Sequence, residues 1–175
     1  MTDFLSLAYS RRSTRRFTPE KLTEDEVVDW LKPALMGPTS KNLHSCELIL
    51  VDRPELLHEL SECRASGAQF VAGAPLAAVV AGNTAVSDVW IEDAAVAAAT
   101  LLYQAENMGL GACWAQVRCR CQDDGTPAAE FVRRILNLPG HIEPLAIVAV
   151  GHKQHDKQPH ADDGMPWENV HFNQY

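Results

Sequence analysis

Hydrophobic side chains recur at helical spacing in several stretches of the sequence. The clearest stretch begins at Thr23, which forms a capping-box pattern with Glu26, and its hydrophobic residues then follow every three or four positions until Gly37. A longer stretch, residues 88–107, is rich in alanine, contains no Gly or Pro, and ends before Gly109. Both patterns predict helices. Three shorter helices are also expected. The first is capped by Thr2 or Asp3, the second begins at Pro54, and the third begins at Thr126-Pro127.

Continuous hydrophobic runs predict four strands, at residues 47–51, 76–81, 111–117 and 144–151. Helices outnumber strands, and their order is not a regular βαβ alternation, so the pattern favours an α+β fold. A length of 175 residues suits one domain or one half of an obligate dimer. The small side chains of the alanine-rich helix indicate close packing, either at the centre of the domain or at a dimer interface.

The balance of charged residues indicates which partners the protein is not expected to bind. The chain has 15 Lys and Arg against 23 Asp and Glu, a formal net charge of −8, which argues against nucleic acid or an anionic membrane surface as a partner. The longest uncharged apolar stretch, between Asp93 and Glu106, is shorter than the roughly 20 residues that a spanning helix needs. Because the N-terminus lacks a secretory pattern and the five cysteines have no regular spacing, we interpret the cysteines as reduced thiols of a cytoplasmic protein.

Against this acidic background, the segment RRSTRRF at residues 11–17 concentrates four arginines. In an extended segment Arg11, Ser13 and Arg15 lie on one face. Guanidinium groups bind phosphate through paired, charge-assisted hydrogen bonds, and the serine hydroxyl adds a donor, so this face is a candidate phosphate site. A solvated surface turn is the alternative, because most charge runs are solvated.

Two further stretches are candidates for ligand contact. In PTSKNLHSCEL, residues 38–48, a polar loop joins a helix to a strand, and Ser40 and Asn42 offer hydrogen-bonding groups. In GLGACWAQV, residues 109–117, small residues would let a flat group approach the backbone and Trp114 offers an apolar surface. An ordinary connecting loop and a packed core strand, respectively, are the alternatives.

These three stretches, the W-x-E-D start of the alanine-rich helix at residues 90–93, and the last strand ending in Gly151 together resemble the nitroreductase family of flavin enzymes. The resemblance covers nearly the whole chain. It implies an α+β fold with a central, mostly antiparallel sheet flanked by helices in an intertwined homodimer. Residues 1–175 would form a single domain, with 152–175 as a C-terminal extension that packs on the partner subunit. FMN would bind at the subunit interface, in two equivalent sites, with NAD(P)H as the electron donor.

The resemblance also implies roles for individual residues. Arg11, Ser13 and Arg15 would touch the phosphate, ribityl chain and pyrimidine edge of FMN, and Arg12 would contribute mainly through its backbone. Pro38, Thr39, Ser40 and Asn42 of the partner would line the ring, while Cys113, Trp114 and Ala115 would lie along its other side near N5. No metal ligands are expected.

This chain departs from the family pattern in two places. His44-Ser45-Cys46 stand where many relatives have Gln-Pro-Trp, which predicts a differently shaped substrate pocket. Relatives also offer a late basic pair to the phosphate, for which the candidates in this sequence are Lys153, His155, Lys157 and His160.

The activity implied by the resemblance is a ping-pong cycle, in which NAD(P)H reduces FMN at N5 and a nitroaromatic, quinone or activated alkene then takes the electrons. Arg15 is the candidate catalytic residue, because a cation near the pyrimidine carbonyl stabilises the negative charge of the reduced ring. The alternatives are a flavin-binding storage or sensor protein without turnover, and a divergent enzyme that fragments its flavin or removes halide.

A thiol or metal site is an alternative from another class, because Cys119-Arg120-Cys121 lies among arginines and the tail is rich in histidine, with His152, His155, His160 and His171. Its single C-x-C does not match the paired spacing of zinc sites.

Overall fold

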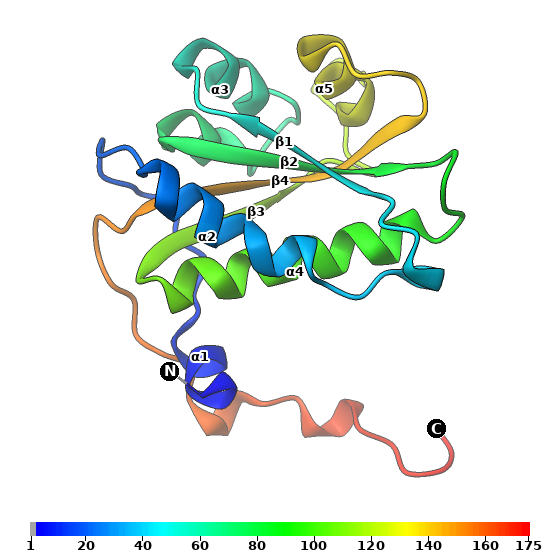
Figure 1. The fold of residues 1–175 in the computed structure, drawn as a ribbon. Coiled ribbons are helices and arrows are strands. Elements are labelled where there is room, and N and C mark those ends of the chain that lie inside the picture. Colours follow the sequence, from blue (N-terminus) through cyan, green and yellow to red (C-terminus); the bar gives the residue numbers. More distant parts are fainter. Residues whose placement is uncertain (1–2) are drawn as a thin grey trace.

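The computed structural model describes residues 3–175, which fold into a layered α+β body with an arm made by both ends of the chain (Figure 1). The helices and strands are α1 (Phe4–Ser10), α2 (Glu24–Leu35), β1 (Cys46–Val51), α3 (Pro54–Ser61), β2 (Leu76–Asn83), α4 (Trp90–Asn107), β3 (Leu110–Gln116), α5 (Ala128–Leu136) and β4 (Ile142–His152). The chain also contains four short 3-10 turns, η1 (Ser40–Asn42), η2 (Gln69–Gly73), η3 (Asp162–Gly164) and η4 (Trp167–Asn169). Each helix and strand expected from the hydrophobic pattern is present, with boundaries that differ by a few residues at most.

The sheet has the strand order β1-β2-β4-β3, and every neighbouring pair is antiparallel. Helices α3 and α5 cover one face, and α2 and α4 cover the other (Figure 1). Alternate residues of β2 divide between the two hydrophobic cores, with Val79 packing on the α3/α5 side and Val80 on the α2/α4 side. The α+β fold with an antiparallel sheet is thereby confirmed.

Helix starts follow the capping signals of the sequence. Thr23 and Glu26 form the reciprocal capping box of α2, and the Asp3 side chain accepts from the Ser6 amide at the start of α1. Thr2, the other candidate cap, lies outside the described residues. In α4 the buried face is largely alanine, and this lets the helix lie close against the sheet.

The N-terminal segment runs along the edge strand β3. Ser13 and Ala112 form a parallel bridge, and the Thr14 amide donates to the Ala112 carbonyl at 2.9 Å. A Cβ on Gly111 would lie 2.5 Å from Cγ2 of Thr14, so only glycine allows this approach. The sequence predicted that the small residues of β3 would let a flat group approach the backbone. At Gly111, that space is filled by Thr14 of the same chain.

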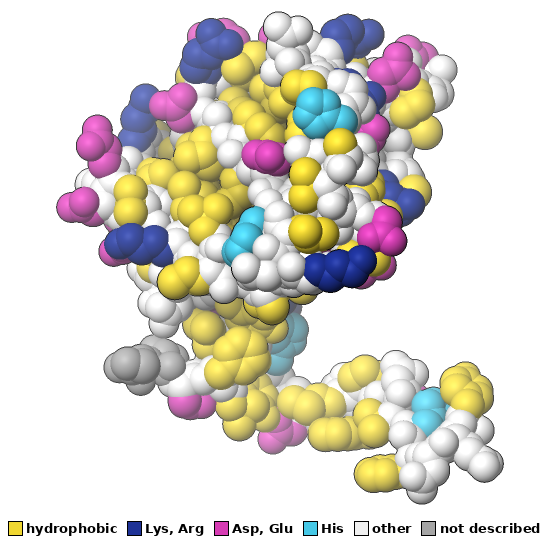
Figure 2. Space-filling model, turned by 45° about the vertical axis from the view of Figure 1, so that its right-hand side comes forward, with side chains coloured by type: hydrophobic (Ala, Val, Ile, Leu, Met, Phe, Trp, Pro, Cys, Tyr) yellow, Lys and Arg dark blue, Asp and Glu magenta, His cyan; other side chains and the backbone are white. Residues whose placement is uncertain are grey.

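Residues from both ends of the chain form the arm, which extends away from the body (Figure 1). The His160 amide donates to the Tyr9 carbonyl at 2.9 Å, and the Tyr9 hydroxyl donates to Asp162, so the C-terminal segment is fastened to α1. Large apolar side chains on the arm are exposed, with Trp167 at 70% and Phe172 at 88%. Hydrophobic side chains mark both the arm and a face of the body in Figure 2.

Within residues 3–175, none of the helices combines the length and the apolar character that a membrane crossing requires.

Candidate functional site

Basic groups from the two ends of the chain converge on Cys113 of β3. Burial raises the pKa of the Cys113 thiol, and the charge of Arg15, the hydroxyl of Ser13, and the charges of Lys157 and Arg11 act against that rise. All four groups therefore lie close enough to Cys113 to affect the pKa of its thiol. We call Arg11, Ser13, Arg15 and Lys157 the cationic cradle.

Lys157 closes the cradle from the C-terminal segment. Its Nζ donates to the Ser13 carbonyl at 2.6 Å, and with His155 it lines a hollow of about 180 Å³ that also includes Thr14, Arg15 and Arg16. Among the other late candidates, Lys153 is occupied by the protein, since its Nζ lies 2.9 Å and 3.0 Å from the two carboxylate oxygens of Glu106.

The charges of the cradle are not neutralised by the protein. Within residues 3–175, no carboxylate lies within 4.0 Å of a basic nitrogen of Arg11, Arg15, Arg16 or Lys157. A chain of net charge −8 thus keeps its unpaired cations beside a half-buried serine and a hollow. Arg15 and Lys157 line the hollow together with Arg16 and His155. Guanidinium and ammonium donors around one small space suit a phosphate dianion, so the residues present fit the phosphate end of FMN.

Arg12 and Trp114 direct their side chains away from the cradle. The Arg12 guanidinium donates to the Gln158 carbonyl, which leaves its backbone for any cofactor contact. The Trp114 indole packs on the α2/α4 core and donates to Gln116 Oε1 at 2.8 Å. Because side chains alternate along a strand, Cys113 and Ala115 share the opposite face, and Trp114 could meet a ligand there only through its backbone.

The second predicted part of the site lies at the far end of α4. Pro38, Thr39, Ser40 and Asn42 lead into β1 beside the first turn of α4, whereas the guanidinium carbon of Arg11 lies 6.0 Å from the ring centre of Tyr103, near the helix C-terminus. At a rise of 1.5 Å per residue, Asp93 and Tyr103 are about 15 Å apart along the helix. One chain therefore does not bring the loop and the cradle to a common ligand (Figure 1).

Residues 38–45 form a strained loop with a buried anchor. Lys41, Asn42 and His44 have positive φ angles of 50°, 55° and 49°. One oxygen of the Asp93 carboxylate accepts from the Ser40 amide at 2.8 Å, and the other accepts from the Ser45 hydroxyl at 2.8 Å. Residue patterns did not identify Asp93 or Ser45 as site residues, although the W-x-E-D motif that contains Asp93 was the available signal.

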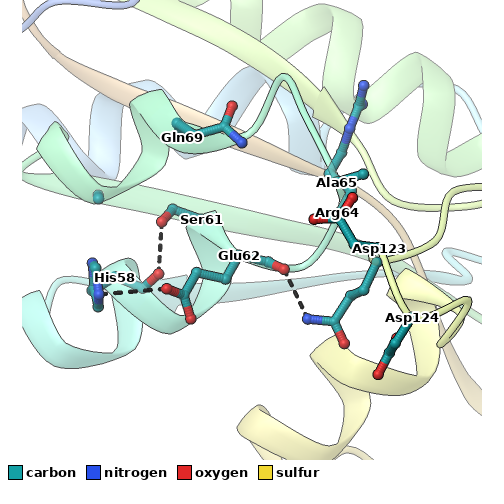
Figure 3. Close-up of a pocket in the computed structure, with 10 residues that line it drawn as sticks. His58, Ser61, Glu62, Arg64, Ala65, Gln69, Asp123 and Asp124 are labelled. Atoms are coloured by element: carbon teal, nitrogen blue, oxygen red, sulfur yellow. Dashed lines mark hydrogen bonds and ion pairs between the residues drawn. The ribbon is translucent and has the colours of Figure 1, made fainter.

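A larger hollow, of about 670 Å³, lies between α3 and the loop before α5 (Figure 3). Three contacts join polar groups of its lining. His58 Nε2 lies 3.7 Å from the Glu62 carboxylate, the Ser61 hydroxyl donates to the His58 carbonyl at 2.7 Å, and the Gln122 amide donates to the Glu62 carbonyl at 2.9 Å. Nothing in the sequence pattern had indicated a site there.

All five cysteines are free, and they fall into two groups. Burial raises the pKa of Cys46 to about 12 and that of Cys63 to about 11, and Cys113 is also buried, whereas Cys119 and Cys121 are exposed. In the part of the chain that the structure describes, no three His, Cys, Asp or Glu side chains are grouped as metal ligands.

Comparison with known proteins gives consistent matches across the chain. A sequence model of the nitroreductase family matches residues 8–69 and 62–152. The solved structure of an FMN-dependent nitroreductase from Clostridium difficile superposes with a TM-score of 0.94 at 37% identity, over 98% of this chain and 99% of that one. A curated FMN reductase (NADPH) from Bacillus subtilis is 30% identical over 87% of this chain and 66% of its own length. The NADPH:FMN oxidoreductase of Vibrio harveyi shares the fold, with a TM-score of 0.82 at 22% identity over 98% of this chain and 77% of that one.

Proposed function

The chain belongs to the nitroreductase family and is an FMN-dependent NAD(P)H oxidoreductase, and we propose that it passes electrons to nitroaromatic, quinone or activated-alkene acceptors in a ping-pong cycle. When bound, FMN supplies the chemistry by taking a hydride at N5 and handing electrons to the acceptor. The protein's own task is to hold the cofactor, tune its charge and control access to it.

The observation that carries the proposal is the set of unpaired cations around Ser13. Arg11, Arg15 and Lys157 reach this point from opposite ends of the chain, and Gly111 lets the N-terminal segment lie against β3. We propose that the cradle binds the phosphate and the adjoining ribityl chain, and that Arg12 and Trp114 contribute backbone groups only.

Arg15 is the proposed catalytic residue. Its guanidinium lies 5.9 Å from the ring centre of Phe70 and has no carboxylate partner among the described residues, so its charge remains available to a ligand. Placed beside the pyrimidine edge, it would stabilise the negative charge that the ring carries after reduction. Cys113 and Ala115 would form the wall of the site on the same face of β3.

We also propose a homodimer in which residues 152–175 pack on the partner. The arm exposes Trp167 and Phe172, and the body exposes Leu35, Met36 and Val96, which together form the kind of apolar surface that a partner subunit buries. A second chain would also bring the loop at residues 38–42 to the cradle, from which one chain keeps it apart. Both observations support two shared sites per dimer.

The test is spectroscopic. The purified protein should be yellow with oxidised-flavin absorbance, NAD(P)H should bleach it under anaerobic conditions, and a quinone or nitroaromatic should restore the colour. A protein that takes up no FMN would overturn the proposal. Bleaching without reoxidation by any acceptor of these classes would instead favour a flavin-binding protein without turnover.

A further inference from the structure

Asp93 is a buried carboxylate with an unusual set of partners. It is 5% exposed in the first turn of α4, and no Lys, Arg or His nitrogen of residues 3–175 lies within 4.0 Å of it. Burying a carboxylate without a cation is costly unless hydrogen bonds satisfy its oxygens. Both oxygens are satisfied, and both donors come from the loop at residues 38–45.

The two donors stand on either side of the strained residues. The Ser40 amide binds one Asp93 oxygen at 2.8 Å, and the Ser45 hydroxyl binds the other at 2.8 Å. Between them lie Lys41, Asn42 and His44, all with positive φ, a conformation that is uncommon for non-glycine residues. Asp93 thus joins the two ends of the loop.

The remaining contacts of the loop are local or lead back to the sheet. The Asn42 amide donates to the Thr39 carbonyl at 3.1 Å, the His44 amide donates to Thr39 Oγ1 at 3.1 Å, and the Asn83 amide of β2 donates to the Ser45 carbonyl at 2.8 Å. Ser45, 1% exposed, is therefore fixed by both β2 and α4. By accepting from the Ser45 hydroxyl, the Asp93 carboxylate couples the position of the loop to a helix that is itself packed on the sheet.

We propose that Asp93 is a positioning residue for the flavin ring. By holding Ser40 and Ser45, it fixes the conformation in which the loop presents Ser40 and Asn42 to the ring bound at the partner's cradle. The inference rests on the proposed function. It predicts that Asp93 and Ser45 affect how the flavin ring is bound and do not affect the binding of the phosphate.

The test compares three variants with a matched control. Asp93→Ala removes both acceptors, Ser45→Ala removes one donor, and Asp93→Asn keeps an acceptor for Ser40 and gains a donor to the Ser45 oxygen. Ser61→Ala is the control, because Ser61 is also a buried serine, at 5% exposure, but bonds only to the His58 carbonyl on α3. Ser45→Ala keeps the test valid if Asp93→Ala fails to fold.

The first measurement does not involve flavin. In the FMN-free protein, hydrogen exchange of peptides covering residues 38–46 should accelerate about tenfold or more in Asp93→Ala and several-fold in Ser45→Ala. Asp93→Asn and Ser61→Ala should stay within about twofold of the wild type. Unchanged exchange in both alanine variants at the loop would overturn the anchoring role of Asp93, whatever the outcome for flavin binding.

The second measurement separates ring from phosphate. Riboflavin lacks the phosphate, so a loosened loop should weaken the binding of riboflavin and of FMN by the same factor, about tenfold for Asp93→Ala. It should also shift the absorption band of the bound flavin. Lys157→Gln should instead weaken FMN binding and leave riboflavin binding unchanged. Faster loop exchange with unchanged affinities and spectrum would show Asp93 to be purely structural and would overturn the inference. A wild-type protein that binds neither flavin would overturn the proposed function together with this assignment, while the exchange result would still report on the anchor.

Discussion

The hollow beside α3 and the cationic cradle are both concave and rich in charge, but their charges are arranged in opposite ways. The hollow is larger, about 670 Å³ against about 180 Å³, and it is lined by side chains of both signs, with the carboxylates of Glu62, Asp123 and Asp124 beside Arg64 and His58. In the cradle, by contrast, no carboxylate of the described residues lies within 4.0 Å of a basic nitrogen, and Arg15 and Lys157 line a common hollow. Size is therefore not the ground on which we propose the cofactor site, because a phosphate would meet carboxylates in the hollow, whereas the side chains that define the cradle are cations and a hydroxyl.

The largest test of this contrast removes two cradle cations. Arg11→Ala with Arg15→Ala should cost roughly 3–6 kcal/mol of FMN binding free energy, because hydrogen bonds to charged groups contribute about 1.5–3 kcal/mol each. The FMN dissociation constant should therefore rise about 10²- to 10⁴-fold, as measured by fluorescence titration.

The matched control for that variant is Arg118→Ala with Arg120→Ala, which removes the same charge from exposed positions in the turn that leads to the hollow's loop. It should leave the dissociation constant within about twofold, since charge beyond a Debye length is largely screened. Equal losses in the two double variants would mean that net charge alone drives binding, and the contrast between the regions would fail.

A second test uses two lysines that stand four residues apart and differ in their partners. Lys157 donates to a backbone carbonyl in the cradle, whereas Lys153 forms a largely buried ion pair with Glu106. Lys157→Gln should weaken FMN binding about 10- to 100-fold with little change in unfolding. Lys153→Gln should leave FMN binding nearly unchanged and lower the free energy of unfolding by about 3 kcal/mol, because Glu106 loses its buried partner.

Thermal melting and FMN titration of both lysine variants check this expectation. A loss of about 3 kcal/mol corresponds to a drop in melting temperature of about 10 °C for a chain of this length. If Lys153→Gln weakened FMN binding as much as Lys157→Gln did, our assignment of the phosphate to the part of the C-terminal segment around Lys157 would be wrong.

The fold could be predicted from the sequence because its signals are local. The capping box at Thr23, the alanine run of α4 and the four hydrophobic runs each mark one element within a short window. The strand order β1-β2-β4-β3 was not predicted, since it depends on contacts between segments far apart in the chain.

The candidate site could be predicted only in part, for a related reason. The spacing of Arg11, Ser13 and Arg15 predicts that they share a face of one extended segment, and this stays a prediction, although all three affect the pKa of the Cys113 thiol. Lys157 could not be separated from three other late candidates, because a distance of 144 residues divides it from Ser13 in sequence. Asp93 was visible only as a helix start, since its hydrogen-bond partners lie 48 and 53 residues away.

The smallest effect is expected in the hollow, where the ion pair of His58 and Glu62 is exposed to solvent. Both side chains are more than half exposed, and surface pairs of this kind contribute only about 0–1 kcal/mol. His58→Gln should therefore change the free energy of unfolding by less than about 0.5 kcal/mol in urea titrations, and should leave FMN binding unaltered. Ser61→Ala, a few residues away and buried, should cost more, about 1 kcal/mol, because it removes a hydrogen bond inside the helix layer. A His58→Gln variant with weakened FMN binding would show that the hollow, despite its internally bonded polar groups, contributes to the cofactor site.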